Sequence, residues 1–239
     1  MPSSVVRVIV HRWHGSASEF HARPIAPLER AEAWLLSLER PALVLGSAQR
    51  GEVADPAAAE ASGVEVVRRN SGGGAVLLEP GRCIWLDVLL PKDDPRWTDD
   101  VGRSAYWLGD VWADTLASLG VEAAVHRGRL EKTTWGRLVC FGAIGPGEVT
   151  VAGRKLVGIS QRRTRHGARF QCLVHESWDP VPLLDLLLLS PGDRSRATAD
   201  LLPVATGTPV GPLETAITDR LQNGSALEAG LQGGDDPRA

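Results

Sequence analysis

The chain has 239 residues, of which 43% are apolar and 23% charged, with a net charge of −3 and a pI of about 6.1. This composition is ordinary for a globular protein, and the slight excess of acidic residues argues against a dedicated nucleic-acid binder. The apolar runs are too short to span a bilayer, and the first fifteen residues lack the apolar core of a signal peptide. We therefore expect a cytoplasmic protein whose three cysteines are reduced thiols.

The first third of the chain alternates short apolar runs with turn residues. Apolar residues three and four apart predict a helix over 26–39, which Pro41 ends, and Asp55-Pro56 followed by alanines predicts a short capped helix. Short runs rich in branched apolar residues predict strands, because such residues suit a half-buried pleated surface. These predicted strands cover residues 5–10, 42–45, 64–67, 75–78 and 83–90.

The middle and end of the chain contain the clearest helical pattern, over residues 99–119, where apolar residues fall on one face and Gly120 follows. Further strands are predicted over 138–141, 148–151, 155–161 and 169–174, and helices over 183–189 and 213–221, with an irregular segment over 203–212. Because strands and helices do not alternate regularly, we predict an α+β domain with a mixed, largely antiparallel sheet and flanking helices. It covers residues 1–222, and the polar, Gly-rich residues 223–239 are predicted to be a disordered tail.

Residues 68–76 read RRNSGGGAV and contain three consecutive glycines. Glycine weakens regular structure, so a run of three is expected where the backbone approaches something closely or adopts a positive φ. Arg68 and Arg69 beside the run suggest a ligand with negative charge. A glycine-rich hairpin turn that binds no ligand would explain the same three residues.

Two further motifs accompany the glycine run. Residues 153–161 read GRKLVGISQ and place Lys155 between two glycines, although a single lysine is most often a solvated surface residue. Residues 42–49 read ALVLGSAQ, a predicted buried strand that ends in a glycine and a glutamine. Each motif alone is a weak signal, and their order along the chain makes the combination specific.

The three motifs in this order resemble the lipoate–protein ligase and octanoyltransferase family, which shares its catalytic fold with biotin–protein ligases. The resemblance runs from about Leu43 to about His175. It implies an enzyme in which Lys155 contacts the acyl carbonyl and the phosphate of an acyl-adenylate, so that a fixed cation stabilises developing negative charge. The ligand-binding residues implied by the resemblance are Arg69, Ser71, Gly72, Gly73, Gly74, Ala75 and Gly158.

The leading interpretation is a ligase that uses ATP, with Mg²⁺, to activate lipoate or octanoate and attach it to a lysine of a carrier domain. The resemblance implies lipoyl-carrier domains of 2-oxoacid dehydrogenases or a glycine cleavage H-like protein as acceptors, with acyl carrier protein as an acyl donor. Neither a membrane nor a nucleic acid is expected as a partner. No residues have the spacing of a structural or catalytic metal site, and His11 and His14 alone are poor evidence for zinc.

Cys140 leads to a second interpretation. It begins the segment CFGAIGPGEVTVAGRK. Cysteine-dependent members of the family have a similar Cys-Phe start, a glutamate before the strand, then GRK and an S-A-Q-x-R motif. The corresponding residues here are Cys140, Phe141, Glu148, Arg154, Lys155, Ser160, Gln161 and Arg163. In those members the cysteine holds the acyl group as a thioester and no ATP is used. A thiolate near cations is a strong nucleophile, but a small buried packing residue would also fit. Cys83 and Cys172 are interpreted as packing residues.

The sequence also departs from the family pattern. Histidines common in the family are replaced by Leu77 or Leu78 after the glycine run, and by residues 171–173 after the second motif. This loss leaves open a third interpretation, a non-catalytic protein that binds an acyl chain or acyl-lysine. Residues 154–169 also carry six cations, which form either a solvated strand edge or a docking face for an acidic carrier: Arg154, Lys155, Arg162, Arg163, Arg165 and Arg169.

Overall fold

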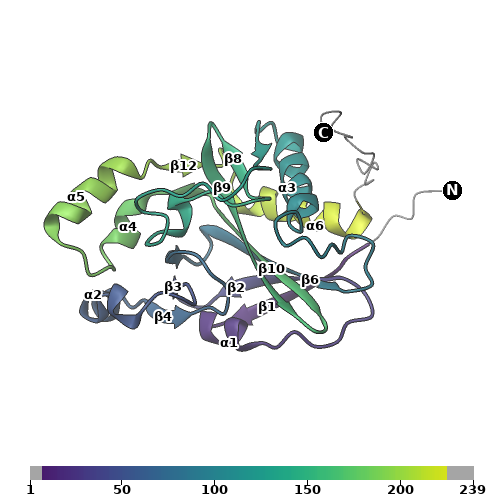
Figure 1. Ribbon diagram of the computed structural model, residues 1–239, viewed down its shortest axis with the longest axis horizontal. Coiled ribbons are helices and arrows are strands. Elements are labelled where there is room, and N and C mark those ends of the chain that lie inside the picture. Colours follow the sequence, from purple (N-terminus) through teal and green to yellow (C-terminus); the bar gives the residue numbers. More distant parts are fainter. Residues whose placement is uncertain (1–6, 225–239) are drawn as a thin grey trace, which may run out of the picture.

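The computed structural model describes residues 7–224, and its main element is a seven-stranded sheet (Figure 1). The strand order is β1-β2-β6-β10-β9-β8-β7; the β1–β2 pair is parallel and the other five pairs are antiparallel. This confirms the predicted α+β class with a mixed, largely antiparallel sheet. The strands are β1 (Ile9–Gly15), β2 (Glu32–Leu38), β6 (Cys83–Pro91), β7 (Ala124–Val125), β8 (Val149–Val151), β9 (Arg154–Thr164) and β10 (Gly167–His175).

Two smaller sheets complete the strand content of the described residues. A three-stranded sheet has the order β4-β3-β5, with β3–β4 parallel and β3–β5 antiparallel. Its strands are β3 (Ala42–Leu45), β4 (Glu65–Arg68) and β5 (Val76–Leu78), and the loop between β4 and β5 carries the three glycines. A two-stranded ribbon pairs β11 (Ser177–Trp178) with β12 (Val204–Ala205).

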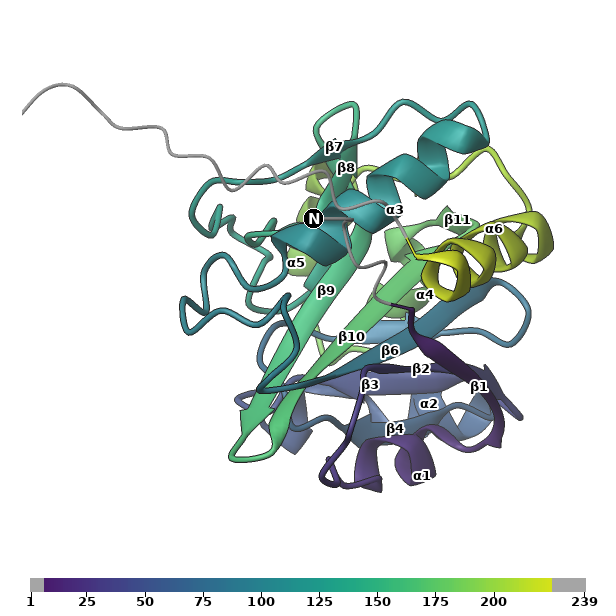
Figure 2. The same ribbon diagram turned by 90° about the vertical axis from the view of Figure 1, so that its right-hand side faces the viewer.

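Helices lie on both sides of the large sheet. Figure 2 shows α3 and α6 on one side, and α1, α2 and the three-stranded sheet on the other. No helix within residues 7–224 combines the length and the apolar character needed to cross a membrane. The helices are α1 (Ala17–Ala22), α2 (Pro56–Ala61), α3 (Tyr106–Ser118), α4 (Pro180–Leu184), α5 (Pro191–Asp200) and α6 (Val210–Asn223), with 3-10 turns η1 (Gly51–Val53) and η2 (Cys140–Gly142).

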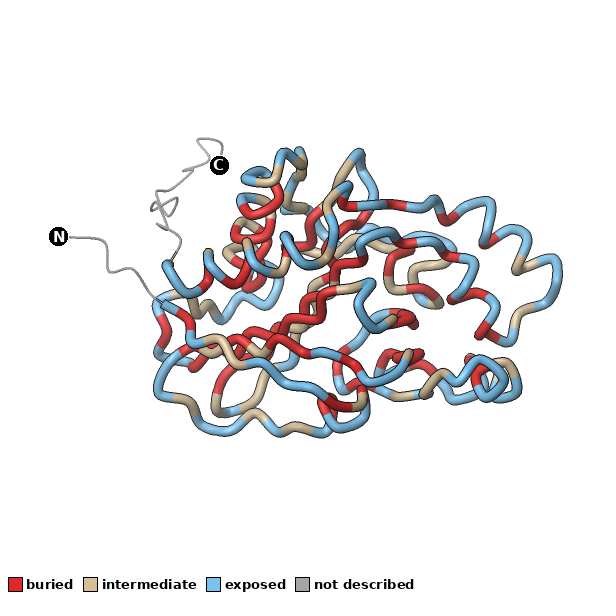
Figure 3. Tube along the Cα trace, turned by 180° about the vertical axis from the view of Figure 1, so that it is seen from behind, coloured by how far each residue is buried: buried red, intermediate tan, exposed pale blue. Residues whose placement is uncertain are grey.

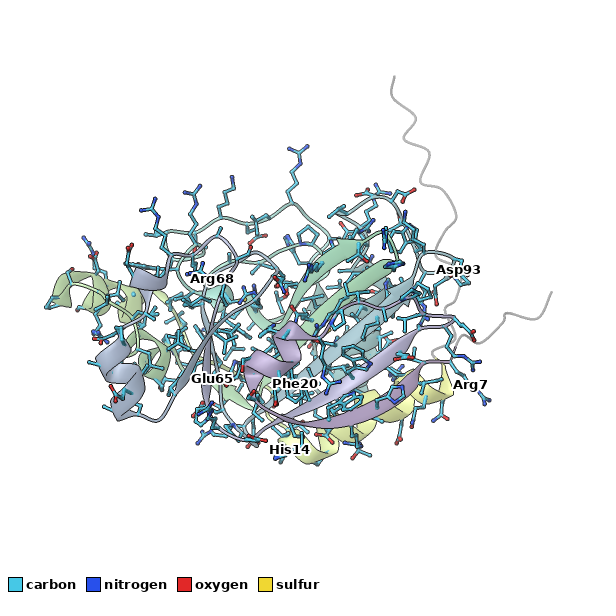
Figure 4. The ribbon with its side chains drawn as sticks, turned by 90° about the horizontal axis from the view of Figure 1, so that it is seen from below. Arg7, His14, Phe20, Glu65, Arg68 and Asp93 are labelled. Atoms are coloured by element: carbon cyan, nitrogen blue, oxygen red, sulfur yellow. The ribbon has the colours of Figure 1, made fainter. Side chains whose placement is uncertain are left out.

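The core follows the central strands, where buried residues concentrate in Figure 3. Eight of the nine residues of β6 are buried, because one face of this strand packs on helices and the other on the three-stranded sheet. On the helical side, Trp107 of α3 meets Phe170 of β10 edge to face, with ring centroids 6.0 Å apart. On the other side, Phe20 of α1 meets Trp85 of β6 in the same way at 5.6 Å, and Figure 4 shows α1 with Phe20 lying against the strands.

The predicted helix over 26–39 is wrong, because Glu32–Leu38 forms strand β2. This segment pairs along its whole length with β1 and over Glu32–Leu36 with β6, so it is an inner strand of the large sheet. Buried and less buried side chains alternate at its start, at Glu32, Ala33, Trp34 and Leu35. An apolar run of this length fits either periodicity, and pairing with two neighbouring strands decides the outcome.

Other predicted boundaries also change. The predicted strand over 138–141 is wrong, because the chain turns into η2 at Cys140. The predicted helix over 99–119 begins only at Tyr106, since the Gln161 side chain bonds the Val101 carbonyl and the Ser104 hydroxyl and holds the preceding turn. The helix predicted over 183–189 is shifted to Pro180–Leu184, and the irregular 203–212 contains β12 and the start of α6. The predicted tail over 223–239 lies outside the described residues, except that Asn223 closes α6.

Other predictions are confirmed. Asp55 caps α2 by accepting hydrogen bonds from the backbone N–H groups of Ala57 (3.0 Å) and Ala58 (3.1 Å), and Pro56 is the first helical residue. The predicted final helix exists as α6 and is longer than predicted.

A fully buried ion pair ties α1 to the large sheet. The Arg169 guanidinium pairs with the Asp87 carboxylate, and the Trp85 indole N–H donates to the other carboxylate oxygen at 2.8 Å. Arg169 also donates to the backbone carbonyl oxygens of Phe20 (2.8 Å) and Arg23 (3.1 Å), at the end of α1. Burial alone raises the pKa of Asp87, and the guanidinium opposes that shift. One of the six predicted surface cations is therefore an internal brace.

Asp87→Asn should destabilise the protein by roughly 3–5 kcal/mol, because it leaves the Arg169 charge buried without its counter-ion. Chemical denaturation measures this free energy of unfolding. The matched control is Asp110→Asn, which breaks the exposed Arg127–Asp110 pair and should change stability by less than about 1 kcal/mol. Equal effects of the two substitutions would contradict the proposed bracing role.

Candidate active site

The glycine run is built for close backbone packing. Gly73 has φ +101°, which favours glycine, and a Cβ on Gly46 would lie 1.9 Å from its carbonyl oxygen. A Cβ on Gly74 would lie 2.6 Å from the backbone nitrogen of Val139. A Cβ on Gly72 would meet nothing within 4 Å. Two of the three glycines are thus required by the fold itself, and Gly72 leaves open space.

Arg69 holds this loop through hydrogen bonds to its backbone. It is buried, and its guanidinium donates to the carbonyl oxygens of Gly72 (2.8 Å) and Gly74 (2.9 Å), with a long contact to Val44 O (3.5 Å). These backbone acceptors occupy most of its N–H groups, since a guanidinium has five. Arg69 thus holds the loop, and its binding of an anionic ligand stays a prediction.

The loop lies directly against the segment that carries Cys140. Ala75 and Val139 form a parallel bridge, in which Ala75 N–H donates to Leu138 O (2.7 Å) and Cys140 N–H donates to Ala75 O (2.8 Å). Gln49 supports the same segment, because its amide donates to Leu138 O at 3.0 Å. The glycine motif and the glutamine motif thus converge on Cys140, which begins η2.

Lys155 reaches the same turn from β9. Its ammonium donates to the Cys140 carbonyl oxygen (2.7 Å) and pairs with the Glu148 carboxylate at 2.9 Å and 2.7 Å from the two oxygens. Only 4% of the Lys155 side chain is exposed, which rules out the solvated surface lysine. Its charge is matched by a carboxylate, and its N–H groups bind protein atoms.

Two hollows meet at Cys140. The first lies between the large sheet and the three-stranded sheet, contains about 450 Å³ of empty space and is almost wholly apolar. About 50 Å³ of it admits the centre of a water molecule, so it is a narrow pocket in this conformation, below the roughly 300–1,000 Å³ of ordinary small-molecule sites. Its lining residues are His21, Val44, Arg69, Val76, Leu78, Trp85, Cys140, Phe141, Gly158, Ile159, Ser160, Gln171, Cys172 and Leu173.

The second hollow is a wide, more polar groove of about 1930 Å³ that opens to solvent. Its walls include the glycine run Gly72–Gly74, together with Glu148 and Lys155. Cys140, Ile159 and Ser160 line both hollows. Cys140 therefore stands where an apolar cavity meets a wider and more polar groove.

The structure brings most of the predicted site residues together, but in different places. Gly72, Gly73 and Gly74 share the groove with Lys155 and Cys140, whereas Arg69 and Gly158 line the apolar cavity. Ser71 and Ala75 are buried and line neither hollow. The Ser71 hydroxyl bonds the Ser160 hydroxyl (3.0 Å) and donates to the side-chain amide oxygen of Gln171 (3.2 Å). Gly153 has φ +73° in the β8–β9 turn, which explains that glycine without a ligand.

The six-cation run is mostly engaged within the chain. Arg154 donates to Pro203 O (2.9 Å), and Arg163 donates to Thr98 O (2.7 Å) while lying over the Trp97 ring. Lys155 and Arg169 are buried in ion pairs, whereas Arg154, Arg162 and Arg165 are exposed and have no carboxylate partner among the described residues. A docking face made of the whole run is therefore not supported.

Two histidines were missed by the sequence patterns. His21 of α1 lines the apolar cavity beside Trp85, with ring centroids 4.8 Å apart, and His175 packs edge to face on Phe141 at 5.2 Å. Desolvation by burial lowers the pKa of His21 to about 3, helped by nearby Arg169 and Arg69, and that of His175 to about 4. Both rings are therefore neutral near pH 7. No local signal marks them, since only tertiary packing brings them to the site.

Within residues 7–224, no cluster of three or more His, Cys, Asp or Glu side chains is arranged to hold a metal ion. The other two cysteines differ from Cys140 in their surroundings. Burial raises the pKa of Cys83 to about 11 and raises that of Cys172 further, so neither thiol ionises readily near pH 7.

Known proteins resemble this chain in sequence and in fold. Residues 21–201 match the family described as lipoyl protein ligase A/B catalytic domain. Octanoyltransferase LipM of Carboxydothermus hydrogenoformans is 34% identical over 149 residues, which cover 60% of this chain and 52% of that protein. LipM of Kyrpidia tusciae is 32% identical over 187 residues, covering 74% and 64%. The chain thus spans less than two thirds of the length of either relative.

A solved structure shows the same fold at lower identity. The bipartite lipoate protein ligase of Thermoplasma acidophilum, whose structure was described with its E2 lipoyl domain, is 16% identical, with a TM-score of 0.66 over 91% of this chain and 83% of that one. At this identity the likeness supports the fold, which agrees with the predicted ligase-like α+β domain.

Gly74→Ala should destabilise the protein by about 1–3 kcal/mol, because its Cβ would overlap the Leu138–Val139 backbone. Gly72→Ala is the matched control and should be nearly neutral, since it has open space and no positive φ. Thermal and urea denaturation of both variants test this. A Gly74→Ala protein as stable as the wild type would contradict the close packing of the two segments.

The buried neutral His175 should make stability fall as pH decreases. Between pH 6.5 and 4 the unfolded chain binds a proton at this residue and the folded chain does not, so acid favours unfolding by up to roughly 3 kcal/mol. In His175→Phe, the free energy of unfolding should fall less between pH 6.5 and 4 than in the wild type, as measured by urea titration at each pH. The control is His14→Gln at an exposed position, which should show the same pH dependence as the wild type.

Proposed function

We propose that this chain, which belongs to the lipoyl protein ligase A/B catalytic domain family, is an octanoyltransferase that carries the acyl group as a thioester on Cys140. The observation that carries the proposal is the position of Cys140 at the junction of the apolar cavity and the polar groove. An acyl chain in the cavity would place its carbonyl carbon beside the thiol, and carrier-bound groups would reach that carbon through the groove.

The lining of the apolar cavity supports a saturated acyl chain. Leu78 and residues 171–173, at or beside the positions where the family pattern has histidines, line this cavity. Leucine and cysteine side chains there favour hydrocarbon over polar groups, because apolar contact gains about 25 cal/mol per Å² buried. The loss of those histidines thus changes the character of the cavity and does not by itself argue for an inactive protein.

The charges around the groove fit a transferase better than the ATP-dependent ligase that the sequence first suggested. A ligase of this family needs a cation for the adenylate phosphate, and Lys155 is paired with Glu148 while Arg69 binds loop carbonyls. The names of the two octanoyltransferase relatives support the same choice. ATP and Mg²⁺ therefore drop out of the proposed reaction.

The proposed reaction has two steps that balance without a cofactor. The Cys140 thiolate attacks the carbonyl carbon of an octanoyl thioester on a donor carrier; a new C–S bond forms, the donor's C–S bond breaks, and the released thiolate takes up a proton. A lysine amine of the acceptor then attacks the Cys140 thioester, forming an amide, losing a proton and restoring the thiol. Donor and acceptor are proposed to be an acyl carrier protein and a lipoyl-carrier domain.

Cys140→Ser should abolish transfer to the acceptor lysine with little change in stability. The test incubates wild type and variant with octanoyl-carrier protein, or with octanoate, ATP and Mg²⁺, and records the intact mass. We expect a hydroxylamine-sensitive octanoyl adduct on the wild type with the carrier thioester alone. Cys83→Ala is the control and should keep the adduct, because burial raises the pKa of its thiol to about 11.

Each other outcome selects a different function. An adduct or acceptor product that forms only with ATP would favour the ligase, as would a Cys140→Ser variant that still transfers the acyl group. An unmodified protein under both conditions would favour the acyl-binding interpretation. The proposal requires two results together. The adduct that the wild type forms must be absent from Cys140→Ser, and the Cys140→Ser variant must keep its fold.

A further inference from the structure

Glu148 is the most heavily bonded carboxylate in the groove. Its side chain is 7% exposed and stands immediately before β8. One carboxylate oxygen accepts from the Lys155 ammonium (2.9 Å) and from the Ile159 backbone N–H (3.1 Å). The other oxygen accepts from the Gly145 backbone N–H (2.6 Å) and lies 2.7 Å from the Lys155 nitrogen in the ion pair. Three donor groups, the Lys155 ammonium and two backbone amides, thus engage both carboxylate oxygens.

Lys155 is directed at protein acceptors. Its ammonium donates hydrogen bonds to one Glu148 oxygen and to the Cys140 carbonyl oxygen, and the second Glu148 oxygen completes the ion pair. The carboxylate balances the buried charge, and the lysine joins Glu148 to the turn that carries the thiol.

The chain of bonds ends on the turn that carries the thiol. It runs from the Gly145 and Ile159 amides, through Glu148 and Lys155, to the carbonyl of Cys140. From the opposite side, Ala75 O accepts from Cys140 N–H (2.8 Å), and Val139 O accepts from Gly142 N–H (3.0 Å). The Cys140–Gly142 turn is thus held from both flanks.

We infer that Glu148 is a positioning residue: through Lys155 it fixes the Cys140–Gly142 turn, and with it the direction of the thiol, without contacting the substrate. This inference rests on the proposed function, because the direction of the thiol matters to the reaction only if Cys140 carries the acyl group. Misplacement of a reacting atom by about 1 Å costs on the order of a hundredfold in rate, so a device of this kind acts on the chemical step. The rival role is a general base that contacts the reacting groups directly.

The test is a double-mutant cycle of Glu148→Gln and Lys155→Met. Gln keeps an oxygen for one of the two backbone amides, and Met keeps the unbranched shape of lysine without its charge. Two quantities are measured: kcat and KM for octanoyl transfer from carrier protein, and amide hydrogen exchange of the peptide covering residues 138–142. The matched control, Asp114→Asn, breaks the Arg220–Asp114 ion pair between α3 and α6.

We expect Glu148→Gln to lower kcat roughly a hundredfold with KM within about twofold of wild type. Exchange in peptide 138–142 should become roughly tenfold faster, because the turn opens more often. On the Lys155→Met background, Glu148→Gln should add less than about a threefold further loss, since it acts through a lysine that is already absent. Asp114→Asn should behave as wild type in both measurements.

Three results would overturn the inference: unchanged exchange of peptide 138–142 in Glu148→Gln, losses that multiply in the double variant, or an effect confined to KM. If Glu148→Gln does not fold, Glu148→Asp takes its place, because a shorter carboxylate keeps its charge but cannot reach all three donor groups. A failure of the proposed function is recognised separately. In that case the wild type forms no acyl adduct, while the exchange measurement still reports whether Glu148 orders the turn.

Discussion

The contact between the glycine loop and the segment ending at Cys140 is the constraint on which the site depends. Gly74 has no side chain because the Leu138–Val139 backbone passes within 2.6 Å of where its Cβ would be. That approach permits the Ala75–Val139 bridge, which joins the loop after β4 to the turn that carries the thiol. A larger residue at Gly74 would push the glycine loop away from the Leu138–Val139 backbone and from the turn that begins at Cys140.

Charge neutralisation is the second organising feature. Arg69 binds carbonyl oxygens of the loop, Arg169 pairs with Asp87, and Lys155 pairs with Glu148; all three cations are buried. Burying an unpaired charge is costly, so each cation is matched by a carboxylate or by backbone acceptors. Cations that looked like ligand-binding residues therefore hold loops, strands and one turn in place. Cys140 lines the groove beside Lys155 and Glu148.

The two hollows differ in character. The cavity between the sheets has an almost wholly apolar lining, and the groove is wider and more polar. In the proposed reaction the first would take the hydrocarbon chain and the second would admit the carriers. A thiol at their boundary can exchange acyl groups between partners that arrive one after the other. The buried neutral His21 and the aromatic Trp85 belong to the cavity wall, so this end of the site is set by packing rather than by charge.

The sequence alone determined the family, the α+β class, and the elements whose signals are local: the Asp55-capped helix, the strands on each side of the glycine run and the final helix. It also brought the glycine run, Lys155 and Cys140 forward as candidates, because residue type and order are visible in one dimension. Tertiary structure decided the rest. Glu32–Leu38 became a strand through its pairing with β1 and β6, and Cys140 began a turn because Gly74 packs beside it. Contacts between residues far apart in the chain decide which cations are paired, and they also bring His21 to the cavity. Such pairings are set by sheet register and by the desolvation cost of burying charge, and neither has a local sequence signal.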